Sequence, residues 1–253
     1  MEFRSNLSEF PKINLHIHSN YSDGTNNIKQ IVKKSLKLGL NYIAITDHFT
    51  NSWKVGIIPT LNSIDKISEY LDEISNCQKY LKENNKNLVL YKGIEVDISS
   101  SERYIKNLLQ IDKFNLVLFE YLQTPESIAF IKNIIRYWKY SIKNVNNFPI
   151  LGLAHFNPFY FIHGSLEILI KFLKNYNIYF EFNSSYPQCY SSRNTHFFEK
   201  LREYNIPVAI GCDSHNLANL NDIDEPLEMI RYYELENNYK ILISILKNSL
   251  KAI

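Results

Sequence analysis

The sequence predicts an α/β barrel built from repeated strand–helix units. Short apolar runs alternate along the chain with longer amphipathic stretches, the pattern of βα units around a parallel sheet. The length of 253 residues suits one such barrel, and the 45% of hydrophobic residues are enough for a large core. Histidines and carboxylates follow several apolar runs, as expected where an active site lies at the carboxyl ends of barrel strands. We therefore expect one domain over residues 1–253.

Seven apolar runs are short enough to be strands and stand apart from the amphipathic stretches. The predicted strands are 12–18, 41–46, 88–94, 114–119, 149–154, 178–182 and 207–210. Apolar residues at helical spacing predict the helices between them, the first beginning near Asn26 and ending at Gly39. Residues 53–59 are expected to be a loop. Further helices are predicted at 61–83, 104–111, 128–142, 166–176 and 194–204, with one or two more from about Pro226.

Two histidines end the first predicted strand. His16 and His18 are two positions apart, so on a strand they project from the same face, as two ligands of one metal ion require. Asp23 and Gly24 then form a turn that can bring a carboxylate back to the same point. Imidazole and carboxylate are ligands of zinc, manganese and iron. Such a pair is weak evidence alone, but similar residues follow other predicted strands: Asp47-His48, Glu95, His155 and Asp213-x-His215.

Taken together, these motifs resemble the PHP family, the polymerase and histidinol phosphatase domains. The matching segments occur in the family's order: His16-x-His18, Ser22-Asp23-Gly24, Ile45-Thr46-Asp47-His48, Gly93-Ile94-Glu95, Ala154-His155, Glu181-Phe182-Asn183 and Gly211-Cys212-Asp213-Ser214-His215. The resemblance covers nearly the whole chain. It implies a distorted (βα)7 barrel, similar to a TIM barrel, with a metal cluster at the C-terminal face of the strands. It also implies a hydrolase that acts on phosphoric ester bonds.

The resemblance further implies two or three divalent metal ions, of Mn, Fe or Zn, and the residues that would hold them. The ligand sets are His16, His18, Glu95 and Asp213 for the first ion, Glu95 and His155 for the second, and Asp23, His48 and His215 for the third.

One position departs from the family's pattern. Relatives usually have a histidine after the fourth strand, where this chain has Leu122, which cannot bind a metal. Glu120 lies two residues earlier and would share a face with Leu122 on a continuing strand. Either Glu120 replaces the histidine, or the second metal ion is weakly bound or absent.

Three further residues are expected to support the site. Asp47 is adjacent to His48 and points the other way on a strand, so it would orient a histidine or a loop, and Asn183 would also lie outside the ligands. Arg193 follows the sixth strand at a possible helix start, where a guanidinium suits phosphate binding. Some histidinol phosphatases are similar in having an arginine there, although a solvated arginine is the alternative.

These expectations favour hydrolysis of a small phosphate monoester by hydroxide from a metal-bound water. Asp213 or His215 would help to position or protonate the leaving oxygen. One alternative is a phosphodiesterase or 3′-5′ exonuclease on nucleotides or nucleic acid, but the net charge of +2 gives no support for a basic groove. The other is a non-catalytic PHP scaffold, which should have lost its ligands.

Composition limits the setting of the protein. The three cysteines are far apart and form no zinc-finger or disulfide pattern, which favours a reducing, cytoplasmic location. Residues 1–11 are polar and lack the apolar core of a signal peptide. No apolar run approaches the roughly 20 residues needed to cross a bilayer, so no membrane partner is expected.

Overall fold

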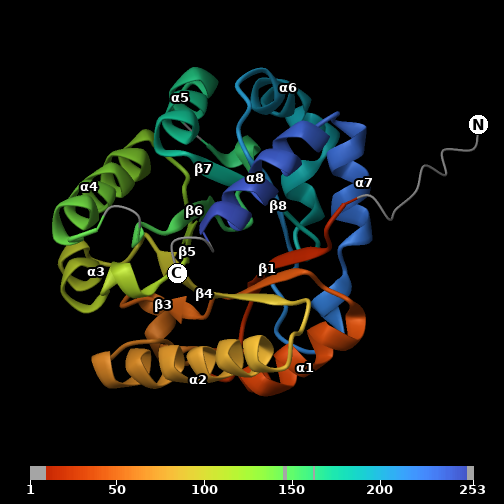
Figure 1. Ribbon diagram of the computed structural model, residues 1–253. Coiled ribbons are helices and arrows are strands. Elements are labelled where there is room, and N and C mark those ends of the chain that lie inside the picture. The colour runs from red at the N-terminus through yellow and green to blue at the C-terminus, as the bar shows by residue number, and fades with distance from the viewer. Residues whose placement is uncertain (1–9, 145–146, 162, 250–253) are drawn as a thin grey trace, which may run out of the picture.

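The computed structural model describes residues 10–144, 147–161 and 163–249, which form a nearly closed barrel of parallel strands surrounded by helices (Figure 1). The strands are β1 (Ile13–Ile17), β2 (Tyr42–Ile45), β3 (His48–Phe49), β4 (Val89–Asp97), β5 (Leu116–Glu120), β6 (Ile150–Leu153), β7 (Ile178–Asn183) and β8 (Val208–Gly211). Seven of them follow one another in the order β1-β2-β4-β5-β6-β7-β8, and β3 pairs with β4. A parallel bridge between Ile17 and Ser214 connects the two edges. The predicted distorted (βα)7 barrel is confirmed.

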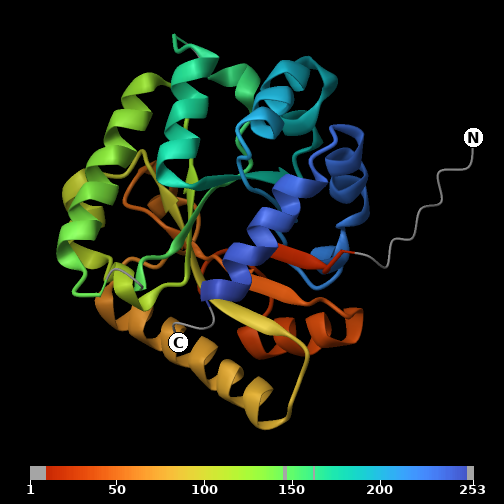
Figure 2. The ribbon, with the colours of Figure 1, turned by 45° about the horizontal axis from the view of Figure 1, so that its top comes forward.

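The helices alternate with the strands and cover the outside of the barrel (Figures 1 and 2). They are α1 (Ile28–Leu38), α2 (Ile64–Glu83), α3 (Glu102–Leu108), α4 (Pro125–Ser141), α5 (Leu166–Tyr176), α6 (Thr195–Glu203), α7 (Asp224–Tyr232) and α8 (Glu236–Ser249).

Side-chain caps explain where several helices begin and end. Asn27 accepts a hydrogen bond from the Gln30 backbone while the Gln30 side chain accepts one from the Asn27 backbone, which is a complete capping box for α1. Gly39 ends the helix in the left-handed region at φ 70°, a conformation that glycine adopts without cost. Serine or threonine caps α2, α3, α4 and α5 in a similar way.

Most predicted bounds differ from the observed ones by a few residues, and three segments illustrate why. The predicted helix 104–111 is α3 (Glu102–Leu108), because Ser101 caps it and accepts from the backbone of Tyr104. The predicted strand 88–94 continues as β4 through residue 97, because it gains new partners in β3 and β5. The predicted loop 53–59 contains a short 3-10 turn, Trp53–Gly56.

A break in the sheet places His48. The β2–β4 ladder ends at the pair Ile45–Lys92, and pairing resumes at His48 opposite Glu95. The Tyr70 hydroxyl of α2 lies 2.7 Å from the carbonyl oxygen of Ile45 and 2.8 Å from that of Gly93, so it satisfies backbone groups at the break. The resumed register sets an imidazole directly opposite a carboxylate.

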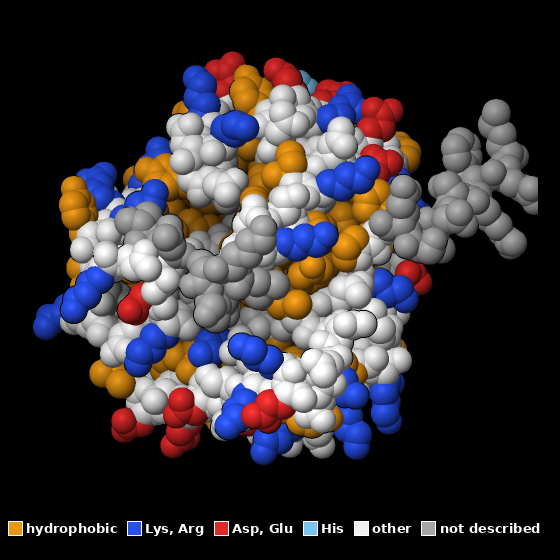
Figure 3. Space-filling model, in the orientation of Figure 1, with side chains coloured by type: hydrophobic (Ala, Val, Ile, Leu, Met, Phe, Trp, Pro, Cys, Tyr) orange, Lys and Arg blue, Asp and Glu red, His pale blue; other side chains and the backbone are white. Residues whose placement is uncertain are grey.

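Helix α8 lies across the amino-terminal end of the barrel (Figure 2). The Tyr91 hydroxyl donates to the carbonyl of Leu246 at 2.9 Å, and the Asn238 amide donates to the carbonyl of Ile206, just before β8, at 2.7 Å. Figure 3 views the molecule from this side and shows Lys and Arg side chains dispersed among polar and hydrophobic ones. The carboxyl ends of the strands face away from α8 and remain available for a site.

Most of the buried side chains are apolar. Buried side chains from the strands and the inner helix faces form one hydrophobic cluster. Cys77, Cys189 and Cys212 are free thiols within the interior. Across the described residues, no helix is both long and apolar enough to cross a membrane. The cytoplasmic location stays a prediction.

Candidate metal centre

Eight side chains that the sequence singled out as metal ligands converge at the carboxyl ends of the strands. They come from β1, β3 and β4 and from the segments that follow β1, β6 and β8: His16, His18, Asp23, His48, Glu95, His155, Asp213 and His215. Their ligand atoms form overlapping groups within 4.8 Å of one another. Residues up to 199 positions apart in the chain thus meet at one point.

The innermost group combines His16 and His18 with two carboxylates. The Nε2 atoms of His16 and His18 lie 3.1 Å apart, and His18 Nε2 is 2.9 Å from Asp213 Oδ1. His16 Nε2 lies 3.4 Å from both Asp213 Oδ1 and Glu95 Oε1. Two ligands about 2.1 Å from one metal ion would be about 3.0–3.4 Å apart, so these spacings suit a shared ion.

A second group lies nearer to solvent. Asp23 Oδ2 is 3.5 Å from His48 Nε2 and 3.2 Å from His215 Nε2, while Asp23 Oδ1 is 3.4 Å from His18 Nδ1. The His215 side chain is 36% exposed and that of Asp23 22%, whereas His16 and Glu95 are fully buried. The centre is therefore open to solvent on the side of His215.

Hydrogen bonds at Nδ1 leave Nε2 free on two of the histidines. His16 Nδ1 donates to Glu181 Oε1 at 2.9 Å, and His215 Nδ1 donates to the Asp213 carbonyl oxygen at 2.8 Å. A neutral imidazole that donates through Nδ1 carries its lone pair on Nε2. Both Nε2 atoms point into the ligand groups, as metal ligation requires.

Glu95 provides the clearest sign that the centre suits a cation. Its carboxylate is fully buried, yet neither oxygen accepts a hydrogen bond from the described residues. Histidine nitrogens surround it, with His48 Nδ1 2.8 Å from Oε2 and His155 Nε2 3.2 Å from Oε1. Because an unsatisfied buried carboxylate is costly, a divalent ion held by Glu95 together with His155 fits the donor set.

The carboxylates and imidazoles also perturb one another's pKa values. Burial lowers the pKa of His16, but the charges of Glu181, Glu95 and Asp213 outweigh it and hold that pKa well above 6.5. Burial raises the pKa of Glu95, but His16 and His48 outweigh it and hold that pKa well below the usual range. In the absence of metal ions, protons on the histidines thus balance the negative charge of the buried carboxylates.

Backbone conformation at three strand ends turns side chains sharply. Tyr121, His155 and Asp213 have φ values of 68°, 34° and 46°, in the left-handed region that non-glycine residues rarely adopt. They follow β5, β6 and β8. Such strained positions concentrate at functional sites, and here two of the three are candidate ligands.

Asp47 and Asn183, expected to support the ligands, contact neighbours of the candidate ligands. Asp47 accepts from the backbone N–H and hydroxyl of Ser19 at 2.8 and 2.6 Å, and from the backbone N–H of Ser22 at 3.1 Å. It therefore holds the loop that presents Asp23. The Asn183 amide donates to Glu181 Oε2 at 2.9 Å.

Glu181 itself had no assigned role in the sequence prediction. It is buried, accepts from His16 through Oε1, and accepts from the backbone N–H of His155 through Oε2 at 2.7 Å. The sequence did contain an indication that Glu181 lies near the site, since Glu181 and Asn183 are two positions apart on β7 and share a face.

Glu120 lies at the edge of the centre, and its role as a replacement for the histidine stays a prediction. It groups with His48 and Glu95, its Oε1 lying 3.6 Å from His48 Nδ1, and it forms no such group with His155. Both of its oxygens instead accept from the ammonium of Lys54, at 2.8 and 2.7 Å. Lys54 was not among the residues predicted from the sequence.

Arg193 is not brought to the ligand groups. It is exposed in the turn Ser192–Asn194, with its guanidinium 6.0 Å from the centre of the Phe159 ring. A phosphate-binding role for Arg193 stays a prediction.

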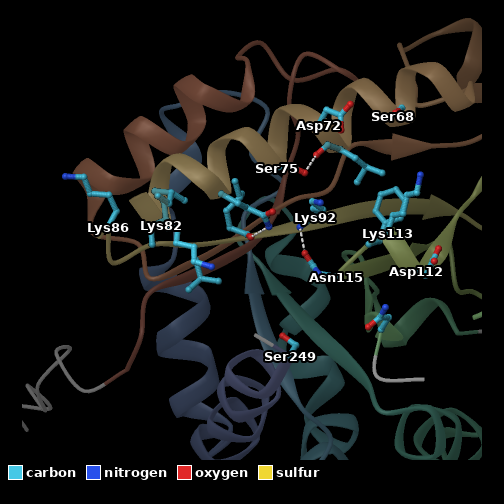
Figure 4. Close-up of a pocket in the computed structure, with 18 of the residues that line it drawn as sticks. Ser68, Asp72, Ser75, Lys82, Lys86, Lys92, Asp112, Lys113, Asn115 and Ser249 are labelled. Carbon is cyan, nitrogen blue, oxygen red and sulfur yellow. Dashed lines mark hydrogen bonds between the residues drawn. The ribbon is translucent and has the colours of Figure 1, made fainter. Parts of the chain in front are cut away.

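A cavity of about 960 Å³ lies away from the candidate ligands (Figure 4). Its walls come from α2, from the beginning of β4 and from the segment just before β5, with Lys82, Lys92 and Lys113 among the lining residues. None of the eight candidate ligands lines it. The candidate metal centre and this cavity are therefore at opposite ends of the barrel.

The fold and the clustered ligands define a parallel barrel protein with a candidate metal centre at the carboxyl ends of its strands. A family model described as the PHP domain matches residues 14–177. This match covers well over half of the chain, and the protein belongs to the PHP domain family.

Individual relatives have low sequence identity to this chain. The DNA polymerase/3′-5′ exonuclease PolX of Bacillus subtilis (strain 168) is 25% identical over 215 residues, which are 84% of this chain and 35% of PolX. The chain thus spans about a third of the length of that relative.

Two phosphatase structures share the fold. Histidinol phosphate phosphatase (HISK) from Lactococcus lactis subsp. lactis Il1403, in complex with Zn, L-histidinol and phosphate, matches with a TM-score of 0.61 and 16% identity. The match covers 88% of this chain and 93% of HISK. A structure from the study of YwqE from Bacillus subtilis and CpsB from Streptococcus pneumoniae, described as metal-dependent tyrosine phosphatases, has a TM-score of 0.54 and 17% identity. That match covers 87% of this chain and 86% of the other. These superpositions show that the fold is shared.

Proposed function

We propose that this PHP protein is a metal-dependent hydrolase of small phosphate monoesters. The observation that carries the proposal is the convergence of five histidines and three carboxylates at the carboxyl ends of the barrel strands. Buried Glu95, neither of whose oxygens accepts a hydrogen bond from the part of the chain that the structure describes, is the strongest single indication of a cation among them. The phosphatase neighbours support the choice of a phosphoester as substrate.

Two or three ions of Mn, Fe or Zn would be held by the inner group around His16 and His18 and by the outer group around Asp23. Bound there, they would lower the pKa of water and offset negative charge on the phosphoryl oxygens. His155 would complete the inner group through Glu95. Zn accompanies the HISK neighbour, but the residues present suit all three metals.

The protein side chains contribute orientation and proton control. Glu181 and the Asp213 carbonyl fix the tautomers of His16 and His215. Asp47 secures the loop that carries Asp23. His215 is the most exposed of the candidate ligands. We propose that His215 or Asp213 positions or protonates the leaving oxygen.

A second candidate function is hydrolysis of phosphodiesters, as a nuclease or phosphodiesterase. It is favoured by the 25% identity to a polymerase that is also a 3′-5′ exonuclease. The balance of 28 basic and 26 acidic residues gives no electrostatic support for nucleic-acid binding. A non-catalytic scaffold role is disfavoured because the predicted ligands are present and grouped.

Hydrolysis of p-nitrophenyl phosphate and bis-p-nitrophenyl phosphate, with Mn²⁺ or Zn²⁺ added, tests the proposal. His48→Ala serves as the blank, and His196→Ala as the control, because His196 is exposed and pairs with Glu199 on α6. We expect turnover of the monoester by the wild type and the control, and none by His48→Ala. Preference for the diester would favour the second function. No turnover together with no bound metal would refute both.

A further inference from the structure

Lys54 is a buried cation beside the candidate metal centre. Its residue surface is only 8% exposed, in the short turn Trp53–Gly56 that follows β3. The ammonium lies between the two oxygens of Glu120, at 2.8 and 2.7 Å. The pair joins residues 66 positions apart, so it is a tertiary contact and not a local one.

The partner of this ammonium belongs to a potential metal-ligand group. Glu120, His48 and Glu95 present ligand atoms within 4.8 Å of one another. Glu120 Oε1 is 3.6 Å from His48 Nδ1, which is itself 2.8 Å from Glu95 Oε2. The ammonium therefore binds one member of this group directly.

The position of Lys54 is built into the fold. Ser52 accepts from the Lys54 backbone N–H and donates to Asp97, a buried carboxylate at the end of β4 that also accepts from Thr50. The ammonium also lies 4.7 Å from the centre of the Tyr121 ring, a cation–π contact. A side chain anchored at its backbone and at its tip has little freedom to leave.

We propose that the Lys54 ammonium is the resident cation of the group His48, Glu95 and Glu120, and that Glu120 binds no metal ion. The inference rests on the proposed metal centre. Both Glu120 oxygens already receive the ammonium. A divalent ion on either oxygen would stand a few ångströms from it in a buried environment that screens their repulsion poorly. Metal ions then bind only through the eight remaining ligands, and Glu120 is neutralised whether or not metal is present.

Metal content of purified protein tests this proposal without any activity measurement. Each variant is loaded with Mn²⁺ or Zn²⁺, dialysed and analysed by inductively coupled plasma mass spectrometry. The deciding variant is Lys54→Met/Glu120→Gln, which replaces the ion pair with neutral side chains of similar shape and so avoids an unpaired buried charge. We expect it to hold the same number of ions as the wild type. The matched control is Lys200→Met/Glu203→Gln, which removes a surface ion pair on α6.

The single variants sharpen the test. Glu120→Gln should leave the number of ions unchanged, and Lys54→Met should gain one ion per chain, because it frees the Glu120 carboxylate for the metal. Circular dichroism establishes that each variant is folded. Loss of an ion in the double variant or in Glu120→Gln would overturn the proposal by showing that Glu120 is a ligand. An unchanged count in folded Lys54→Met would overturn it as well. Absence of metal from the wild type would instead refute the proposed function, and this inference with it.

Discussion

Glu181 is the residue that connects the ligands of different strands. One of its oxygens receives the imidazole of His16 from β1, and the other receives the backbone of His155 after β6 and the amide of Asn183 on β7. In Glu181→Gln, one of these acceptors becomes an amide NH₂ that cannot accept a hydrogen bond. We expect metal affinity to fall about 10–100-fold, as is usual when the hydrogen-bond partner of a ligand is lost. Competition with a chromogenic chelator measures this change.

Glu203→Gln provides the control for this prediction, because Glu203 is an exposed residue that pairs with Lys200 on α6. It should bind metal as the wild type does. Equal metal affinity of Glu181→Gln and the wild type would show that Glu181 only fills space beneath the centre.

At the scale of the strand, Gly211 allows β7, β8 and β1 to meet. A Cβ atom added to Gly211, the last residue of β8, would lie 1.8 Å from Glu181 Oε1 and 2.8 Å from the Cβ atom of His16. Both neighbours are buried parts of the centre, so neither can move freely. We expect Gly211→Ala to lower the free energy of unfolding by about 1–3 kcal/mol, as overpacking does, and to weaken metal binding. Urea unfolding and chelator competition measure the two effects.

Gly56→Ala is the matched control, since a Cβ atom there would meet nothing within 4 Å. Its free energy of unfolding should stay within about 0.5 kcal/mol of the wild type. A Gly211→Ala variant as stable as Gly56→Ala would contradict the close approach described here.

The elements that the sequence predicts well are those with local signals. Helix α5 (Leu166–Tyr176) has its predicted bounds, and α1 lies between the predicted cap region and Gly39. The two-residue strand β3 was not predicted, because only its pairing with the distant β4 defines it. The candidate ligands were found for a similar reason to the helices: their motifs are short and stand at strand ends. The Lys54–Glu120 pair has no such motif, since it depends on how a turn folds back over a strand 66 positions away.

At the scale of the whole molecule, the candidate metal centre concentrates buried charge at one end of an apolar barrel. The buried carboxylates Glu95 and Asp213 lie beside His16, and the part-exposed Asp23 lies beside His48. Burial lowers the pKa of His48, but Glu95, Asp23 and Glu120 outweigh it and raise that pKa. Without metal, the centre therefore depends on protonated histidines for charge balance.

Metal removal should accordingly destabilise the whole barrel, and more so at higher pH. Because the pKa values of His16, His48 and His155 are raised on folding, their contribution to stability is fully present below about pH 6.5 and is lost as the pH rises through the folded values. Metal ions compete with these protons, so metal affinity changes in the opposite sense and increases with pH. At a metal concentration of about 100 times Kd, the stabilisation is about 3 kcal/mol, or roughly 5–10 °C in Tm for a chain of this size.

Thermal unfolding at pH 6, 7 and 8, with EDTA or with excess Mn²⁺, measures the difference in Tm between the two states. We expect that difference to widen from pH 6 to pH 8. In His48→Ala it should be smaller at every pH, because one ligand of the outer group is missing. A difference in Tm that stays constant or narrows as the pH rises would mean that the histidines do not exchange protons for metal. That result would contradict the interpretation of the cluster as a metal centre, but it would not affect the assignment of the barrel fold.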